Sequence, residues 1–297
     1  MAAGLLDIKR RIKSVKSTKK ITKAMGLVAT AKLRKTKNLL VVNDEYFNSL
    51  DRIRDKIFSA IEVGCESPFV NENSSEKKLI VLFASNSGLC GGFNANVTTY
   101  LNNTYSDNKN NVSVFLIGRR GEAYLKKFGF TIYDKFFDFK ENLDLKDART
   151  ISSKILDAYL NNEFGQISLI STVFKSSIDQ EVNECIILPF TKDNTNNLVD
   201  NDENVINGEN EREIFESEVP DEELVSVFLY RYLEGKLINA MVHSRACEEN
   251  FRMQAMDGAT KNADDILEKL QSKYNRIRQG AITQEISEIV GGAEAQK

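Results

Sequence analysis

Residues 220–292 decide the fold, and they read PDEELVSVFLYRYLEGKLINAMVHSRACEENFRMQAMDGATKNADDILEKLQSKYNRIRQGAITQEISEIVGG. Pro220 and the acidic residues 221–223 are typical of a helix start, because proline is tolerated in a first turn and acidic side chains complement the positive end of the helix dipole. No proline follows, and Gly291-Gly292 is a plausible stop. The stretch predicts one helix about 105 Å long, at about 1.5 Å per residue.

Apolar residues follow a heptad spacing in this helix and in residues 1–64, where proline is absent and only Gly4, Gly26 and Gly64 are glycine. The predicted seam residues are Ala263, Leu267, Leu270, Tyr274, Ile277 and Ala281 in the last helix; Leu5, Ile8, Ile12 and Val15 at the start of the first; and Leu39, Val42, Tyr46, Leu50, Ile53, Ile57 and Ala60 or Ile61 in its second half. Helices this long need a partner along their length. We therefore predict an antiparallel pair of the two ends, rather than two helices packed separately on a globular core.

Small residues replace large apolar ones in the middle of each seam, at Ala24, Gly26, Ala29 and Ala31, and at Gly258, Ala259 and Ala263. A glycine inside a helix costs about 1 kcal/mol relative to alanine. The small residues favour close approach of two backbones in a narrow shaft, or they face solvent or another chain. We expect residues 24–31 to lie opposite residues 252–259.

Residues 77–190 alternate strand-like and helix-like segments, which indicates a Rossmann-like α/β domain with a mostly parallel sheet. Strands are predicted at 78–84 and 112–117, helices at 94–104, 119–128 and 147–163, and a hairpin from 167–175 and 183–189; residues 131–133 and 136–139 are ambiguous. Residues 191–219 form an acidic, Asn-rich loop. The fold class is therefore α/β: a long antiparallel coiled coil of the terminal helices plus a central domain, with the last helix at 220–292.

Composition narrows the class of protein. The longest purely apolar run, Leu79 to Ala84, is too short to span a bilayer, and residues 1–4 lead directly into a helix, so we expect no signal peptide. The four cysteines, Cys65, Cys90, Cys185 and Cys247, form no CxxC pair, and the chain has one histidine. We expect no metal site, a reducing compartment and buried thiols.

Charge is unevenly distributed. A basic stretch contains Lys9, Arg10, Arg11, Lys13, Lys16, Lys19, Lys20, Lys23, Lys32, Arg34, Lys35 and Lys37, with no acidic residue among them. A solvated helix face would normally mix signs, and nucleic-acid binding would be favoured by interleaved aromatic residues, which are absent. An acidic protein surface around the helix agrees best with a narrow shaft.

No catalytic constellation emerges. The turn Gly88-Leu89-Cys90-Gly91-Gly92 follows a strand, as a phosphate loop does, but its spacing differs from GxGxxG and no Walker Lys-Ser/Thr follows. Cys90 has only His243, on the last helix, as a possible imidazole partner. The acidic pairs Glu248-Glu249 and Asp264-Asp265 are neighbours in a helix, so their side chains diverge. We interpret the turn as a packing element and the pairs as solvated or paired charges.

Both ends of the chain resemble the gamma subunit of F-type ATP synthases, in its bacterial form. The resemblance rests on IKSVKSTKKITKAM (12–25) with VATAKLR (28–34), FRMQAM (251–256), YNRIRQGAITQEISEIV (274–290) and the turn GLCGGFN (88–94). It implies a non-catalytic central-stalk rotor inside a ring of alpha and beta subunits. In that family the globular domain contacts the epsilon subunit and the c-subunit ring, and ATP, ADP and magnesium bind to partner subunits.

The resemblance also implies a peripheral location on the cytoplasmic side of the cell membrane, held by partners, with no cofactor bound by this chain and no nucleic acid. The family's partner-contact positions correspond to Met25, Arg252, Arg278, Gln279, Thr283 and Glu285. Asn86-Ser87 stands where the family usually has Asp-Arg, which puts an ion pair there in doubt, and the thiol switch of photosynthetic members is absent. The alternatives are a static coiled-coil tether with an α/β head and, more remotely, a nucleotide-dependent enzyme built on the Gly88 turn.

Overall fold

The structure is a computed structural model that describes residues 2–60, 67–71, 73–139, 144–190 and 220–294. The chain divides into two compact units, an end unit of Met1–Ala31 with Arg252–Lys297, and a central unit of Lys32–Phe251. The predicted loop at 191–219, residues 61–64 and Cys65 lie outside the described residues.

Two long helices begin and end the described chain, α1 (Ala2–Ala60) and α5 (Asp221–Glu294). Helix α5 starts directly after Pro220, whose carbonyl accepts a hydrogen bond from Leu224 N at 3.0 Å. The predicted stop at Gly291-Gly292 is wrong, because α5 continues through both glycines to Glu294. Each glycine weakens a helix by only about 1 kcal/mol, and no proline follows to block the next turn.

The central unit contains a five-stranded sheet with strand order β3-β2-β1-β4-β5. Its strands are β1 (Lys78–Phe83), β2 (Val112–Ile117), β3 (Thr131–Phe136), β4 (Gln166–Phe174) and β5 (Gln180–Leu188). Strands β1 to β4 are parallel, and β5 pairs antiparallel with β4 as the predicted hairpin. The Rossmann-like prediction is confirmed, and the ambiguous region near residue 131 is the edge strand β3.

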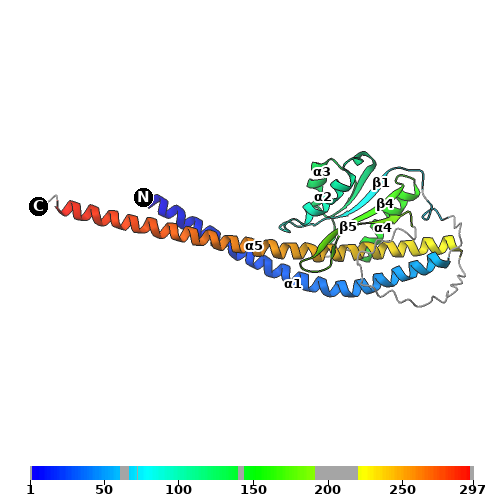
Figure 1. Cartoon of the computed structure of the whole chain (residues 1–297), viewed down its shortest axis with the longest axis horizontal. Coiled ribbons are helices and arrows are strands. Elements are labelled where there is room, and N and C mark those ends of the chain that lie inside the picture. Colours follow the sequence, from blue (N-terminus) through cyan, green and yellow to red (C-terminus); the bar gives the residue numbers. More distant parts are fainter. Residues whose placement is uncertain (1, 61–66, 72, 140–143, 191–219, 295–297) are drawn as a thin grey trace. The chain divides into compact units, whose positions relative to one another are not determined.

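Helices cover both faces of the sheet, which explains why β1 is a nearly continuous apolar run. The helices between the strands are α2 (Phe93–Tyr105), the short 3-10 helix η1 (Lys109–Asn111), α3 (Gly121–Phe128) and α4 (Leu145–Leu160). On one face, α2 and α3 join Ile80 and Leu82 in a buried core. On the other, α4 and residues of α1 and α5 join Leu79 and Val81 (Figure 1).

Within the central unit, the predicted seam of α1 is out of phase. Leu39, Val42, Tyr46 and Ile53 are 42–66% exposed, while the buried residues are Leu33, Thr36, Leu40, Phe47, Leu50, Arg54 and Ile57. Of the predicted seam residues whose side chains the structure describes here, Leu50 and Ile57 are also buried. Apolar pairs such as Leu39-Leu40 and Tyr46-Phe47 give this helix two overlapping apolar stripes. The stripe that includes Phe47 is the one buried against α5. The ring centroid of Phe47 lies 5.4 Å from that of Tyr232 on α5.

Polar contacts join the two helices in the same unit. The Tyr232 hydroxyl donates to Asp51 Oδ1 at 2.9 Å and accepts from Arg54 Nη1 at 3.0 Å. Burial raises the pKa of Tyr232, and the nearby Asp51 carboxylate raises it further. The phenol therefore stays protonated at neutral pH and keeps its donor role.

Helix α1 packs closely against α5 at Gly235 in this unit. A Cβ there would lie 2.6 Å from Leu50 Cδ1 and 3.6 Å from Tyr46 Cε1. For Gly258 the sequence left close approach and a face toward solvent or another chain open, and no atom lies within 4 Å of the equivalent position, which favours the second. The absence of a side chain at Gly235 therefore lets Leu50 and Tyr46 of α1 pack against α5, whereas a side chain at Gly258 would meet no neighbouring atom.

We predict opposite effects of alanine at these two glycines. Gly258→Ala should stabilise α5 by about 1 kcal/mol through helix propensity. Gly235→Ala gains the same propensity but overpacks against Leu50, which costs about 1–3 kcal/mol and makes it the less stable variant. Urea unfolding followed by far-UV circular dichroism compares the two. Equal stabilisation by both substitutions would show that α1 and α5 are not in close contact at Gly235.

Candidate functional site

The end unit pairs the first part of α1 with the last part of α5 along the predicted seam. Ile8 and Ala263 are buried, and Leu5, Ile12, Val15, Leu267, Leu270, Tyr274, Ile277 and Ala281 are half-buried between exposed neighbours. The heptad seam predicted for this part of both helices is confirmed. Its apolar residues are therefore occupied in holding the pair together, and the outward faces remain available for other proteins.

Polar and small residues fix the register of this pair. The Thr22 and Thr260 hydroxyls hydrogen-bond at 2.8 Å, Lys19 pairs with Asp264, and a Cβ on Gly26 would lie 3.5 Å from Met256 Cβ. The helices run antiparallel, and residues 24–31 lie opposite residues near 252–258, as expected. The Thr22–Thr260 contact is not predictable from the sequence, because threonines at seam positions carry no distinctive pattern.

The end of α5 extends past the first residue of α1 in this register. Ile282, Ile286, Ile289 and Val290 follow helical spacing and are 48–71% exposed. Nothing in the described part of the end unit covers this apolar stripe. Exposed apolar patches on otherwise charged surfaces mark sites of protein contact, so this stripe is a candidate partner surface.

Cations dominate the outward face of α1 in the end unit. Lys9, Arg10, Arg11, Lys13, Lys16, Lys20 and Lys23 are exposed. Within the residues that the structure describes, these seven side chains form no ion pair, whereas Lys19 pairs with Asp264. These seven cations are therefore not neutralised by the described residues of α5, which favours an external acidic partner.

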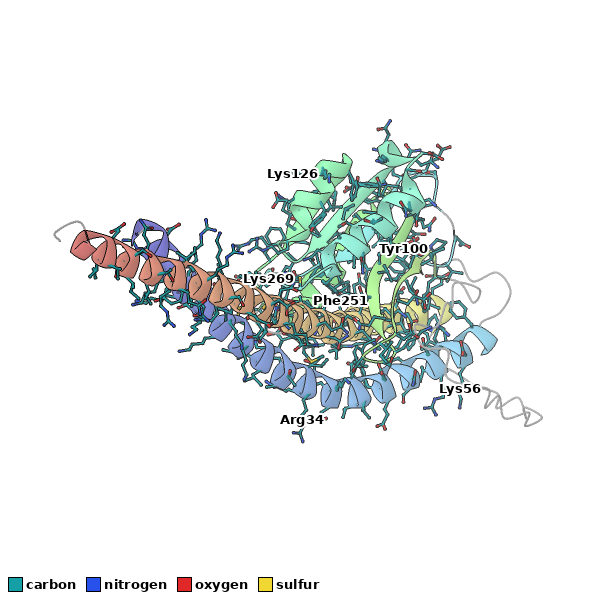
Figure 2. All side chains as sticks on the ribbon, turned by 60° about the vertical axis from the view of Figure 1, so that its left-hand side comes forward. Arg34, Lys56, Tyr100, Lys126, Phe251 and Lys269 are labelled. Carbon is teal, nitrogen blue, oxygen red and sulfur yellow. The ribbon has the colours of Figure 1, made fainter. Side chains whose placement is uncertain are left out.

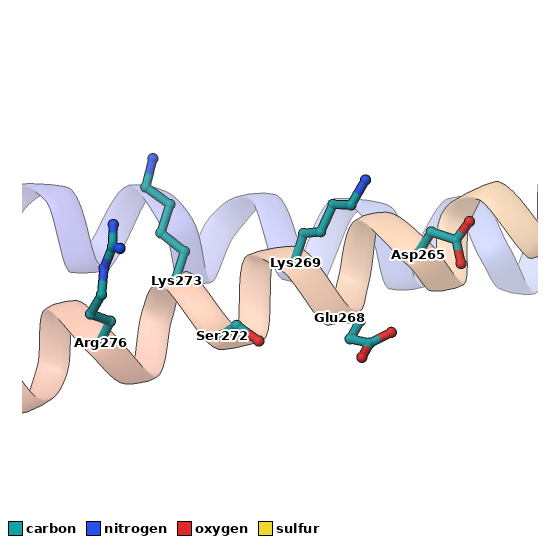
Figure 3. A pocket seen from close by; sticks show the side chains of 6 residues that line it. All are labelled: Asp265, Glu268, Lys269, Ser272, Lys273 and Arg276. Atoms are coloured by element: carbon teal, nitrogen blue, oxygen red, sulfur yellow. The ribbon is translucent and has the colours of Figure 1, made fainter.

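Helix α5 adds further cations to the same unit. Figure 3 shows Lys269, Lys273 and Arg276 projecting to one side of α5, while Glu268 points to the other. With Asp265 and Ser272 these residues line a shallow hollow of about 760 Å³. The cations repeat by four and three, so they form a continuous basic strip along the helix.

The six predicted contact residues do not converge on one pocket. Met25 is half-buried and Arg252 is buried, whereas Arg278, Gln279, Thr283 and Glu285 are exposed. Arg252 and Arg278 are separated by about 39 Å along α5, at about 1.5 Å per residue. The candidate site is therefore an extended surface of the helix pair, not a cleft.

The glycine turn of the central unit lies at the carboxyl end of β1, where strand order reverses between β1 and β4. Open α/β sheets bind ligands in the crevice at such a reversal. Here Cys90 and Phe93 after β1 form a buried cluster with Cys247 of α5, against which Phe174 and Phe251 pack. Side chains of α5 fill the position that a ligand would take, so the turn serves packing.

Residues 86 and 87 keep polar contacts without the family's usual charges. Asn86 Nδ2 donates to the Phe137 carbonyl at 3.2 Å, and Asn86 Oδ1 accepts from Arg119 N at 3.0 Å. Ser87 Oγ donates to Glu248 Oε1 at 3.4 Å. Glu248 also pairs with Arg245 at 2.9 Å, so its charge is balanced from its own helix.

Cys90 and His243 do not form a nucleophile–imidazole pair, because each contacts other groups. Cys90 Sγ lies 3.6 Å from Ser85 Oγ and 3.3 Å from Asn94 Nδ2, while both ring nitrogens of His243 bond to Phe174 and Asp44. Burial raises the pKa of Cys247 far above its usual value. Among the described residues no group of three or more His, Cys, Asp or Glu side chains could hold a metal ion.

None of the helices within the described ranges combines the length and the apolar character needed to cross a bilayer.

Comparison with known proteins assigns the family. The family model described as ATP synthase matches residues 4–296. The ATP synthase gamma chain of Clostridium perfringens (strain SM101 / Type A) is 46% identical over 295 residues, covering 99% of each chain. The chain belongs to the ATP synthase gamma chain family. The gamma chain of Clostridium botulinum (strain Kyoto / Type A2) is 42% identical over the same share of both chains.

Solved structures show the same fold. A chain of the Euglena gracilis mitochondrial ATP synthase in rotational state 3 (OSCP/F1/c-ring) gives a TM-score of 0.69 at 17% identity, covering 100% of this chain and 95% of that one. A chain of the Tetrahymena thermophila mitochondrial ATP synthase central stalk and c-ring gives 0.62 at 22% identity, covering 80% and 99%. The predicted fold and the resemblance to the gamma subunit are thus confirmed.

Proposed function

We propose that the chain is the central-stalk rotor of an F-type ATP synthase, which couples ion flow through the membrane sector to ATP synthesis or hydrolysis by rotation. Membership of the gamma chain family carries the proposal. The chain is a subunit of the complex, and we infer that it contributes no catalytic group. The crevice at β1 and β4, which Cys247 and Phe251 fill, supports this inference.

The surface of the end unit suits a shaft enclosed by other subunits. Its apolar seam is used internally, and its outward face carries the seven cations of α1 that lack an ion pair within the described residues. Exposed ion pairs contribute about 0–1 kcal/mol each. Because each pair is this weak, the charged surface can move from one acidic partner to the next, and no single ion pair holds the shaft at one angle.

The partners we propose are those of the gamma subunit. The alpha and beta subunits would surround the end unit, with nucleotide and magnesium bound on those subunits. The epsilon subunit and the c-ring would contact the central unit, and through them the chain would be held on the cytoplasmic side of the cell membrane. The exposed stripe of Ile282, Ile286 and Ile289 supports an enclosing ring, because such a stripe needs apolar contacts.

We propose that Met25, Arg252, Arg278, Gln279, Thr283 and Glu285 contact the ring during rotation. These residues are spread along the length of the helix pair, which favours contacts with the ring at several heights along its central cavity. The exposed members, from Arg278 to Glu285, are available to a partner without rearrangement of the pair.

The direct test is rotation of the assembled complex. The ring is fixed to a surface and a gold rod is attached to the α/β domain of this chain. We expect stepwise rotation of the rod in one direction when ATP is added, and loss of ion-coupled ATPase activity in complexes that lack the chain. A rod that stays fixed while ATP is hydrolysed with full ion coupling would favour the static tether instead.

We also predict that Met25→Lys impairs coupling while leaving assembly largely intact. Met25 is half-buried within the basic stretch of α1, so an added ammonium would be screened less by solvent than the exposed cations are, and its attraction to an acidic partner would resist rotation. ATP-driven proton pumping into vesicles, divided by the rate of ATP hydrolysis, should fall. Met25→Leu, which adds no charge, is the matched control, and a normal ratio in both variants would contradict the proposed role of Met25.

A further inference from the structure

Four residues on one side of α5 contact the α/β domain in the central unit. His243 Nδ1 accepts a hydrogen bond from Phe174 N at 3.2 Å, and Asn250 Nδ2 donates to the Ser177 carbonyl at 3.0 Å. Cys247 Sγ donates weakly to the Thr172 carbonyl at 3.7 Å, and the Phe251 ring lies 6.2 Å from that of Phe93. Positions 243, 247, 250 and 251 follow the spacing of one helix face.

This set, which we call the α5 grip, is enclosed. His243 is 1% exposed, and Cys247 and Asn250 are fully buried. Figure 2 shows Phe251 on the side of α5 that faces the α/β domain. Three of the four contacts end on backbone atoms of β4 or of the turn after it. Thr172 and Phe174 lie where β4 pairs with β5, beyond its pairing with β1, and Ser177 lies in the turn between β4 and β5, so the grip is attached to the β4–β5 hairpin.

His243 extends the grip to α1. A backbone N–H can only donate, so Nδ1 must accept from Phe174, and the ring proton lies on Nε2. Nε2 then donates to Asp44 Oδ1 of α1 at 2.9 Å, and Asn239 Nδ2 donates to the same oxygen at 2.8 Å. The imidazole thus joins the strand, α5 and α1 in fixed directions.

We propose that the α5 grip is where torque passes between the α/β domain and the rotor helices, with His243 and Asn250 as positioning residues. This inference rests on the proposed function. Apolar packing alone resists rotation of a helix about its axis weakly, because contacts of similar quality form at nearby angles. Directional hydrogen bonds to strand backbone fix both the angle of α5 and its axial position.

Helix α1 is held differently at the same turn. Lys37 Nζ donates to Ser177 Oγ at 3.2 Å and lies 4.9 Å from the centre of the Phe174 ring. A lysine ammonium on a flexible four-carbon stem is a compliant connection. Torque therefore enters α5 first and reaches α1 through Asp44 and the shared apolar core.

The test measures torsional stiffness in the assembled complex. The ring is fixed, the rotor is stalled without ATP, and a rod on the α/β domain reports angular fluctuations. In Asn250→Leu, which keeps the size of the side chain but removes its donor, we expect the variance to rise about twofold, because the directional hydrogen bond to the Ser177 carbonyl is lost. The double variant Asn250→Leu/Phe251→Ala should exceed that increase.

Leu101→Ala is the matched control, since Leu101 is fully buried in the core on the opposite face of the sheet. It should lower thermal stability without changing the variance. Unchanged variance in both grip variants would overturn the inference, as would an equal rise in the control. If the double variant fails to assemble, the variance measured for Asn250→Leu alone tests the inference. Absence of ATP-driven rotation in the unmodified complex would instead refute the proposed function.

Discussion

The structure depends on the antiparallel pairing of α1 and α5. Neither helix carries enough intrinsic helical stability to remain ordered over 59 or 74 residues in water without burying its apolar face. In the end unit that burial comes from a thin seam, reinforced by the Thr22–Thr260 contact and by close packing of Gly26 on Met256. In the central unit it comes from aromatic residues such as Phe47 and Tyr232. The same two helices thus use different chemistry in each unit.

This arrangement explains why a Rossmann-like sheet can serve without binding chemistry of its own. The crevice at the β1–β4 reversal receives Cys247 and Phe251, so α5 takes the place of a ligand. The glycine turn remains necessary, because Cys90 and Phe93 must approach the helix closely. The segment Gly88–Gly92 resembles a degenerate phosphate loop in the sequence, but in the structure Cys90 of this turn and Phe93 pack against α5. The domain has become an attachment for the rotor helices rather than a catalytic site.

Most of the fold could be predicted from the sequence because its signals are local. The apolar run of β1, the turn residues and the heptad spacing from Leu5 to Val15 each specify one structure. The second half of α1 could not be predicted, since Leu39-Leu40 and Tyr46-Phe47 support two seams and only packing against α5 chooses between them. The close packing at Gly235 could not be predicted for a related reason: one glycine in a helix gives no sign of what lies opposite. Of the candidate site, the basic face of α1 was predictable from its charge run. The spread of Met25, Arg252 and Arg278 along the pair required the register.

The pairing of α1 with α5 is tested most directly by a disulfide cross-link between the two helices in the assembled complex. Thr22→Cys with Thr260→Cys replaces two hydroxyls that lie 2.8 Å apart, a separation compatible with a disulfide after small adjustments. Mild oxidation should link the two positions within one chain, and ATP-driven rotation should continue, because α1 and α5 turn together. Failure of the link to form, or rotation that stops when it forms and resumes on reduction, would show that α1 and α5 do not pair and turn as one shaft.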